Sequence, residues 1–104
     1  MAKKVINGKV YDTATAEVLH SDSYSNPRDF AHWVKTLYRT KIGTLFVYGK
    51  GGPMSEYSRT IGPNEWSGGD GFEVLTAAEA IKWLEDHDGD DAILEYFGDG
   101  VAEA

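Results

Sequence analysis

The chain has 104 residues, a net charge of −7 at neutral pH and no cysteine. This length suits one domain that buries a core without metal or disulfide support, and the lack of cysteine excludes disulfides, thiolate zinc sites and cysteine nucleophiles. Hydrophobic residues make up 41% of the chain, as in a folded globule, and no apolar run approaches the length of a membrane span. We therefore expect a single small domain over residues 1–104 that is soluble and cytoplasmic.

The first predicted element is a β-hairpin near residues 5–11. Val5-Ile6 and Lys9-Val10-Tyr11 flank the pair Asn7-Gly8. A two-residue type I′ turn favours this pair because both of its central residues need a positive φ. The sequence therefore predicts two short antiparallel strands at the start of the chain.

Strands also dominate the predicted middle of the chain. Residues 13–19 fit either a strand or a short helix, and residues 21–26 are predicted to form a polar loop. A short turn of helix near residues 28–32 precedes a second β-hairpin near 36–48, which is rich in Thr, Tyr, Phe and Val. Glycine and proline then predict an irregular chain over residues 49–71.

An amphipathic helix is predicted over residues 76–86. Thr76 and Glu79 have the spacing of a capping box, in which each side chain satisfies a backbone N–H group near the other residue. The apolar positions recur at helical spacing and predict the face that packs on a sheet; they are Ala77, Ala80, Ile81 and Leu84.

Two short segments flank this helix. Residues 72–75 are predicted as a strand, and residues 92–97 as a short helix capped by Asp90 or Asp91, although their Ile, Tyr and Phe also suit a strand. The expected fold class is α+β: a small antiparallel sheet built from the two hairpins, with the C-terminal helix packed on one face. The sheet residues expected in the core are Val10, Leu37, Leu45, Val47 and Val74.

Acidic residues concentrate at the C-terminal end. Residues 70–104 contain eleven Asp and Glu but one Lys, a net charge of −10, whereas residues 1–69 carry a net charge of +3. The acidic C-terminal segment, residues 85–104, attracts cationic partners and repels nucleic acid and anionic membranes. The candidate partner-binding residues are Glu79, Glu85, Asp86, Asp88, Asp90, Asp91 and Glu95.

A calcium site is the first alternative for these acids. The run that begins at Asp86 resembles half of an EF-hand loop, but Asp91 stands where the loop needs glycine and Phe97 where it needs a bidentate glutamate. The other interpretation is a solvated acidic turn. The three histidines are far apart and lack metal-pair spacing. We predict no metal site and no cofactor.

Signals for other chemistry are weak. Residues 49–53 follow a strand but lack the spacing of a phosphate loop or a dinucleotide fingerprint. The spacing of Ser, His and Asp suggests neither a triad nor a carboxylate dyad, so we expect no enzymatic activity. Lys35, Arg39 and Lys41 lie near aromatic residues on the second hairpin, which allows a sheet face that stacks nucleic-acid bases. Alternatively, they are the solvent-exposed positions of a half-buried sheet.

Four segments carry a distinctive pattern. Residues 6–13, 36–43, 46–52 and 75–85 read INGKxYDT, TLYRTKxG, FxYGxGG and LTxxEAxxWLE, where x is any residue. This pattern resembles a family of small proteins carried by phages and mobile elements of Gram-positive bacteria. The Asp-rich segment after residue 86 lies outside the pattern, and the resemblance assigns no role to any residue.

The resemblance implies an anti-defence role, because small, acidic, cysteine-free proteins of mobile elements resemble anti-CRISPR and anti-restriction proteins. Carboxylates can fill a surface whose Lys and Arg side chains normally hold phosphates. We therefore expect a non-enzymatic inhibitor that binds a host CRISPR effector through its acidic surface and blocks nucleic-acid binding or a subunit contact. It would contact neither nucleic acid nor membrane directly. The alternative is a structural or assembly module of the mobile element, whose acidic surface only confers solubility.

Overall fold

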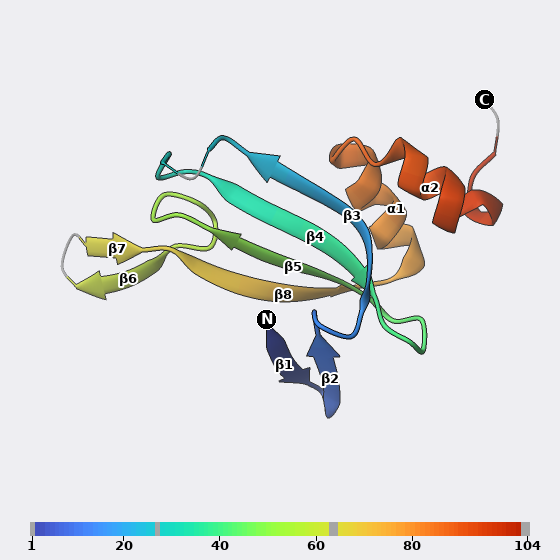
Figure 1. The fold of residues 1–104 in the computed structure, drawn as a ribbon, viewed down its shortest axis with the longest axis horizontal. Helices are drawn as coiled ribbons and strands as arrows, with labels where there is room; N and C mark the ends of the chain where they lie inside the picture. The colour runs from blue at the N-terminus through green and yellow to red at the C-terminus, as the bar shows by residue number, and fades with distance from the viewer. Residues whose placement is uncertain (1, 27, 63–64, 103–104) are drawn as a thin grey trace.

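The fold was obtained as a computed structural model that describes residues 2–26, 28–62 and 65–102. Within these ranges the chain forms eight strands, two α-helices and one short 3₁₀ turn, which confirms the predicted α+β class. The molecule is elongated, with extents of 50 × 34 × 19 Å. Figure 1 shows a four-stranded sheet with both helices at one end, a narrow β-ribbon at the other, and the N-terminal hairpin below.

The predicted N-terminal hairpin is confirmed. Strands β1 (Lys3–Ile6) and β2 (Lys9–Asp12) pair antiparallel around Asn7 and Gly8, whose φ angles are 51° and 76°. Both turn residues therefore have the positive φ that a type I′ turn requires. The hairpin forms a two-stranded sheet of its own, so the prediction that it shares one sheet with the 36–48 hairpin is wrong.

The larger sheet has the strand order β3-β4-β5-β8, with every neighbouring pair antiparallel. Its strands are β3 (Glu17–Tyr24), β4 (Trp33–Arg39), β5 (Leu45–Gly51) and β8 (Gly69–Leu75). The hairpin β4–β5 confirms the prediction for residues 36–48. The turn between these strands is closed by a hydrogen bond from the Gly43 N–H to the Thr40 carbonyl oxygen, at 2.9 Å.

The structure corrects several expectations for the middle of the chain. Residues 21–24 are the second half of β3, not a loop, because an edge strand tolerates polar side chains once its backbone pairs with β4. Residues 28–32 form tight turns in place of a turn of helix. The glycine-rich stretch contains a β-ribbon of β6 (Arg59–Gly62) and β7 (Glu65–Ser67), which projects from the sheet in Figure 1.

Two helices follow the sheet. Helix α1 (Ala77–Asp86) begins with the predicted capping box: the Thr76 hydroxyl accepts a hydrogen bond from the Glu79 N–H at 3.2 Å, and the Glu79 carboxylate accepts one from the Thr76 N–H at 2.9 Å. Helix α2 (Asp90–Tyr96) confirms the helical alternative for the last segment. Its N-cap is Gly89, however, so the prediction that Asp90 or Asp91 caps it is wrong.

The main core lies between the sheet and the helices. Leu37 and Leu84 are fully buried, and each comes from a different layer. The buried residues of this core are Leu19, Leu37, Leu45, Val47 and Leu75 from the sheet, and Ala80, Leu84, Ala92 and Ile93 from the helices. Three of the five predicted sheet residues are therefore confirmed.

A second core lies on the opposite face of the sheet. Phe46 is fully buried and points away from the helices, because neighbouring residues of a strand face opposite sides. Tyr11 of the N-terminal hairpin packs edge-on against Phe46, with ring centroids 5.4 Å apart. Tyr38 and Phe72 stack on the same ring from β4 and β8. The hairpin is thus held to the sheet by an aromatic cluster.

The two cores explain which predicted core residues are wrong. Val10 is 59% exposed because the hairpin buries its neighbour Tyr11 instead. Val74 is 40% exposed because it faces away from the helices on the edge strand β8, while Leu75 faces them. Ala77 is also exposed, since it lies in the first turn of α1 and the next turns carry the packing.

Candidate partner-binding surface

All seven predicted site residues are exposed on the helical end of the molecule. Glu79, Glu85 and Asp86 belong to α1, Asp88 lies in the turn, and α2 carries the other three. We call this set the acidic surface; it comprises Glu79, Glu85, Asp86, Asp88, Asp90, Asp91 and Glu95. The helices bury Ala80, Leu84, Ala92 and Ile93 toward the sheet, so the carboxylates are left on the outer side.

Two members of the acidic surface already have partners within the chain. Hydrogen bonds with Thr76 hold the pKa of Glu79 below its usual value. The backbone N–H of Thr76 has the larger effect and its side-chain hydroxyl the smaller one. Asp86 forms an ion pair with Lys82 at 2.9 Å, one helical turn away. This hydrogen-bonded pair raises the pKa of Lys82. These two carboxylates therefore serve the helix itself as well as any external partner.

The lowered pKa of Glu79 predicts how stability depends on pH. The charge of Glu79 stabilises the fold above its unfolded-state pKa, near 4.5, and this contribution is lost as the pH falls through the lower folded-state pKa. Glu79→Gln keeps a side chain that suits a capping box but removes the charge. We expect the variant to be less stable than the wild type at neutral pH and equally stable in acid. Urea unfolding of both proteins across this pH range measures the difference, and a constant difference would contradict the assignment.

The turn between the helices is held in place by its neighbours. Asp88 has a φ of 57°, and the next N–H, from Gly89, donates to the Leu84 carbonyl oxygen at 2.7 Å. His20 of β3 reaches the His87 carbonyl oxygen with its Nε2 at 2.8 Å. The His87 ring stacks on Trp83, with centroids 4.2 Å apart. The backbone of the acidic turn is therefore tied to the sheet and to helix α1.

Five members of the acidic surface have no cationic partner among the described residues. They are Glu85, Asp88, Asp90, Asp91 and Glu95. Leu94, on α2 beside them, is 68% exposed. Glu85 and Asp90 also line one shallow groove with Leu94, so α1 and α2 bring these charges together around an apolar side chain.

A second groove lies between β8 and α1, with a volume of about 430 Å³. Its charged residues are Glu73, Glu79, Lys82 and Asp86, and its apolar lining comes from Leu75, Ala78 and Trp83. We call it the β8–α1 groove. Glu73 was not predicted as a site residue, because only the register Val47↔Glu73 places its side chain on the helix side of the sheet. Side chains alternate between the two faces of a strand, so Glu73 lies on the same face as Leu75, two residues later. This alternation is the sequence signal that could have identified Glu73.

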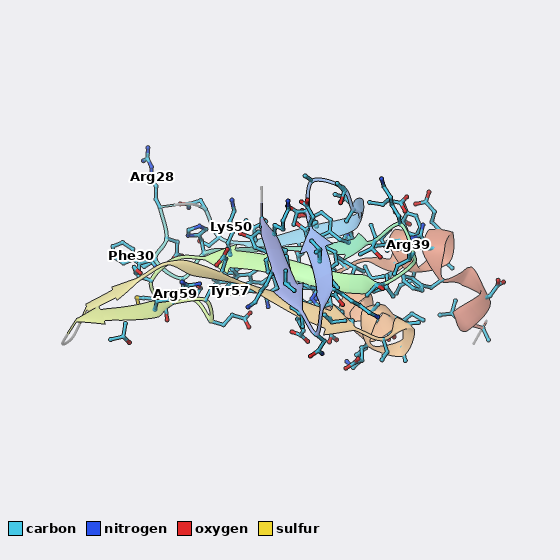
Figure 2. The ribbon with its side chains drawn as sticks, turned by 90° about the horizontal axis from the view of Figure 1, so that it is seen from below. Arg28, Phe30, Arg39, Lys50, Tyr57 and Arg59 are labelled. Carbon is cyan, nitrogen blue, oxygen red and sulfur yellow. The ribbon has the colours of Figure 1, made fainter. Side chains whose placement is uncertain are left out.

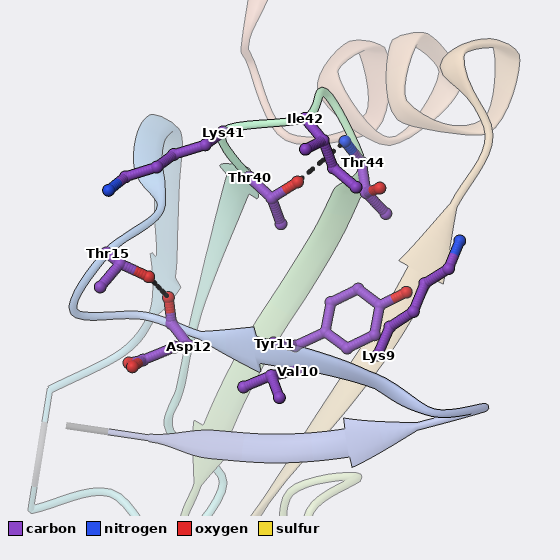
Figure 3. A pocket seen from close by; sticks show the side chains of 9 residues that line it. All are labelled: Lys9, Val10, Tyr11, Asp12, Thr15, Thr40, Lys41, Ile42 and Thr44. Atoms are coloured by element: carbon purple, nitrogen blue, oxygen red, sulfur yellow. Dashed lines mark hydrogen bonds between the residues drawn. The ribbon is translucent and has the colours of Figure 1, made fainter.

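A third groove, of about 350 Å³, has a different character. Figure 3 shows it between strand β2 and the β4–β5 turn, with Lys9 and Lys41 at opposite ends. Ile42 contributes an exposed apolar side chain to its rim. This groove was not predicted, because the two segments that form it are about thirty residues apart in the sequence.

Two of the three basic residues noted on the second hairpin form ion pairs within the chain. Lys35 is ion-paired with Glu56 and lies 4.7 Å from the ring centroid of Trp33. Arg39 is ion-paired with Glu17 at 2.7 Å, close to the helices in Figure 2. Both cations therefore have partners within the chain, and Lys41 is the one exposed residue of the three.

The glycine-rich stretch after β5 serves packing. A Cβ atom on Gly49 would overlap the ring of Tyr57, which lies across the strand. Burial of this ring raises the pKa of Tyr57 to about 12. A phosphate would find the backbone of Gly49 covered by that ring, so this glycine is explained by the close approach of an aromatic side chain.

No group of three or more His, Asp or Glu side chains in the described ranges is arranged to hold a metal ion. None of the helices described is long and apolar enough to cross a membrane. No protein-family model, curated protein or solved structure matches the chain.

Proposed function

We propose that this protein is a non-enzymatic inhibitor of a mobile element, which binds a host CRISPR effector through the acidic surface. The observation that carries the proposal is the set of five exposed carboxylates on α1, α2 and their turn, which lack a cationic partner in the described part of the chain. The resemblance of four sequence segments to mobile-element proteins supplies the biological setting.

Charge complementarity is the physical basis of this proposal. An effector that binds nucleic acid lines its channel with Lys and Arg side chains that contact phosphates. Carboxylates carried on a backbone that is held in place offer those cations the same charge-assisted hydrogen bonds, and the fixed backbone lowers the entropic cost of binding. The acidic turn is anchored by His20 and Trp83, so it meets this requirement.

The test removes three of the unpaired charges. In Asp88→Asn/Asp90→Asn/Asp91→Asn we expect affinity for a purified CRISPR effector to fall about tenfold or more, with a weaker dependence on salt. The control variant, Ser23→Lys/Met54→Lys/Thr60→Lys, changes the net charge equally at exposed positions outside the helices. Calorimetry or surface plasmon resonance at two salt concentrations measures both. Equal affinity of the two variants would exclude the acidic surface as the binding site.

A second candidate function is an assembly module of the mobile element. Phe30 and Met54 favour it, because they are 66% and 73% exposed and their loops are joined by a hydrogen bond from the Met54 N–H to the Phe30 carbonyl oxygen at 2.7 Å. Figure 2 shows Phe30 at the end of the molecule remote from the helices. Light scattering separates the two functions, since a module that self-assembles would exceed the 11.5 kDa of the monomer without any effector.

A further inference from the structure

Strand β8 is the last strand of the four-stranded sheet, and Figure 1 shows it at the lower edge. Its pairing with β5 is continuous from Leu45↔Leu75 to Gly51↔Gly69, without a bulge. The opposite edge strand, β3, has a register shift between Val18 and His20. A bulge disrupts the regular ladder that an incoming strand would need, so β8 is the better template.

The hydrogen bonds of the β4–β5 hairpin identify which backbone groups of β8 point outward. The bonds Thr40 N–H to Thr44 O and Gly52 N–H to His32 O show that even-numbered residues of β5 bond to β4. Odd-numbered residues of β5 therefore bond to β8, where their partners are also odd-numbered. The backbone N–H and C=O groups of Asp70, Phe72 and Val74 consequently face away from the sheet.

The side chains beside this edge define what an added strand would carry. On the helix side, the β8–α1 groove is lined by three acidic residues, Glu73, Glu79 and Asp86. Lys82 is the single basic residue in its lining. On the other side, Phe72 is half-buried and Val74 is 40% exposed. Side chains of a strand alternate between the two faces. A complementary strand would therefore place Lys or Arg in the groove and apolar residues next to Phe72 and Val74.

We propose that the outer edge of β8 binds an extended partner segment with alternating basic and apolar residues, which joins the sheet as an additional antiparallel or parallel strand. Main-chain hydrogen bonds to Asp70, Phe72 and Val74 supply affinity, and the β8–α1 groove selects the basic side chains. The proposal deepens the proposed function and rests on it in one respect: the partner is a protein with a basic surface.

The first experiment uses a short synthetic peptide of alternating Lys and Val as the probe. In the free protein, we expect the amide hydrogens of Asp70, Phe72 and Val74 to exchange rapidly with solvent, and those of Gly71 and Glu73 to be protected. Added peptide should protect the first set, as followed by NMR. A peptide of alternating Glu and Val should bind at least tenfold more weakly. Equal binding of the two peptides, or no protection of Val74, would overturn the proposal.

The second experiment changes the edge itself. Val74→Pro removes an outward N–H group and leaves the ladder to β5 intact, so affinity for the Lys-Val peptide should fall about tenfold. Ser23→Pro removes an N–H group from the β3 edge, where it donates to the Asp22 carboxylate at 2.9 Å, and is the control, expected to bind the peptide normally. Glu73→Lys should reverse the preference between the two peptides, and this readout does not depend on the proline variants folding.

The outcomes also separate this proposal from the proposed function. If the Asn variants of the acidic surface lose the effector while no peptide binds β8, the inhibitor function stands and the strand-addition proposal fails. If the Lys-Val peptide binds β8 while no CRISPR effector binds the protein, the edge site stands and the partner belongs to another class.

Discussion

Phe46→Ala is expected to lower the free energy of unfolding by about 3–5 kcal/mol, the usual cost of truncating a buried phenylalanine. Phe46 is fully buried at the centre of the second core. Its ring contacts Tyr11 from the N-terminal hairpin and Tyr38 and Phe72 from the sheet. The substitution therefore leaves a cavity that three aromatic rings cannot fill without moving.

Denaturant unfolding followed by fluorescence and circular dichroism measures this loss. Phe30→Ala is the matched control, because Phe30 is 66% exposed and its truncation should change the free energy of unfolding by less than about 0.5 kcal/mol. If Phe46→Ala were as stable as the control, the N-terminal hairpin would not pack on the sheet as described.

Leu84→Ala is expected to cost about 2–5 kcal/mol. Leu84 is fully buried in the core that joins α1 and α2 to the sheet, and a Cβ atom on Gly89 would collide with it. The loss should appear first in the helices, since the four-stranded sheet keeps its own ladder and its second core. Residue-resolved hydrogen exchange measures this effect. Relative to the wild type, exchange in the Leu84→Ala protein should accelerate more in α1 and α2 than in β4 and β5.

Leu94→Ala provides the comparison on the other side of the helices. Leu94 is 68% exposed, so truncation should leave stability within about 0.5 kcal/mol of the wild type. Uniform acceleration of exchange throughout the Leu84→Ala protein would contradict a separate helical unit and indicate that the two cores unfold together.

Local signals in the sequence predicted local structure well. Asn7-Gly8 specified its turn and Thr76 with Glu79 specified the start of α1, because each motif is satisfied by backbone groups within a few residues. The β4–β5 hairpin was also predictable, since short strands flank a tight turn. Predictions failed where the answer depended on distant packing. Val10 and Tyr11 are neighbours on one strand, and only the position of Phe46 decides which of them is buried.

The candidate site shows the same division. Composition alone located the acidic surface, because charge asymmetry needs no knowledge of the fold. Glu73 was not predicted as a site residue because it lies on a strand and Asp86 lies on a helix. Only the register of β8 shows that both residues line one groove. The availability of the β8 edge depends on the order of four strands, which no single segment specifies.

The separation of charge along the molecule also affects how a partner is reached. The acidic surface occupies the helical end, whereas Figure 2 places Arg28, Lys50 and Arg59 toward the opposite end of the sheet. Such a distribution gives the whole molecule an electric dipole along its longest direction. In the field of a cationic surface this dipole turns the protein during diffusion so that the helices arrive first. For the proposed inhibitor, this orientation would raise the fraction of productive encounters.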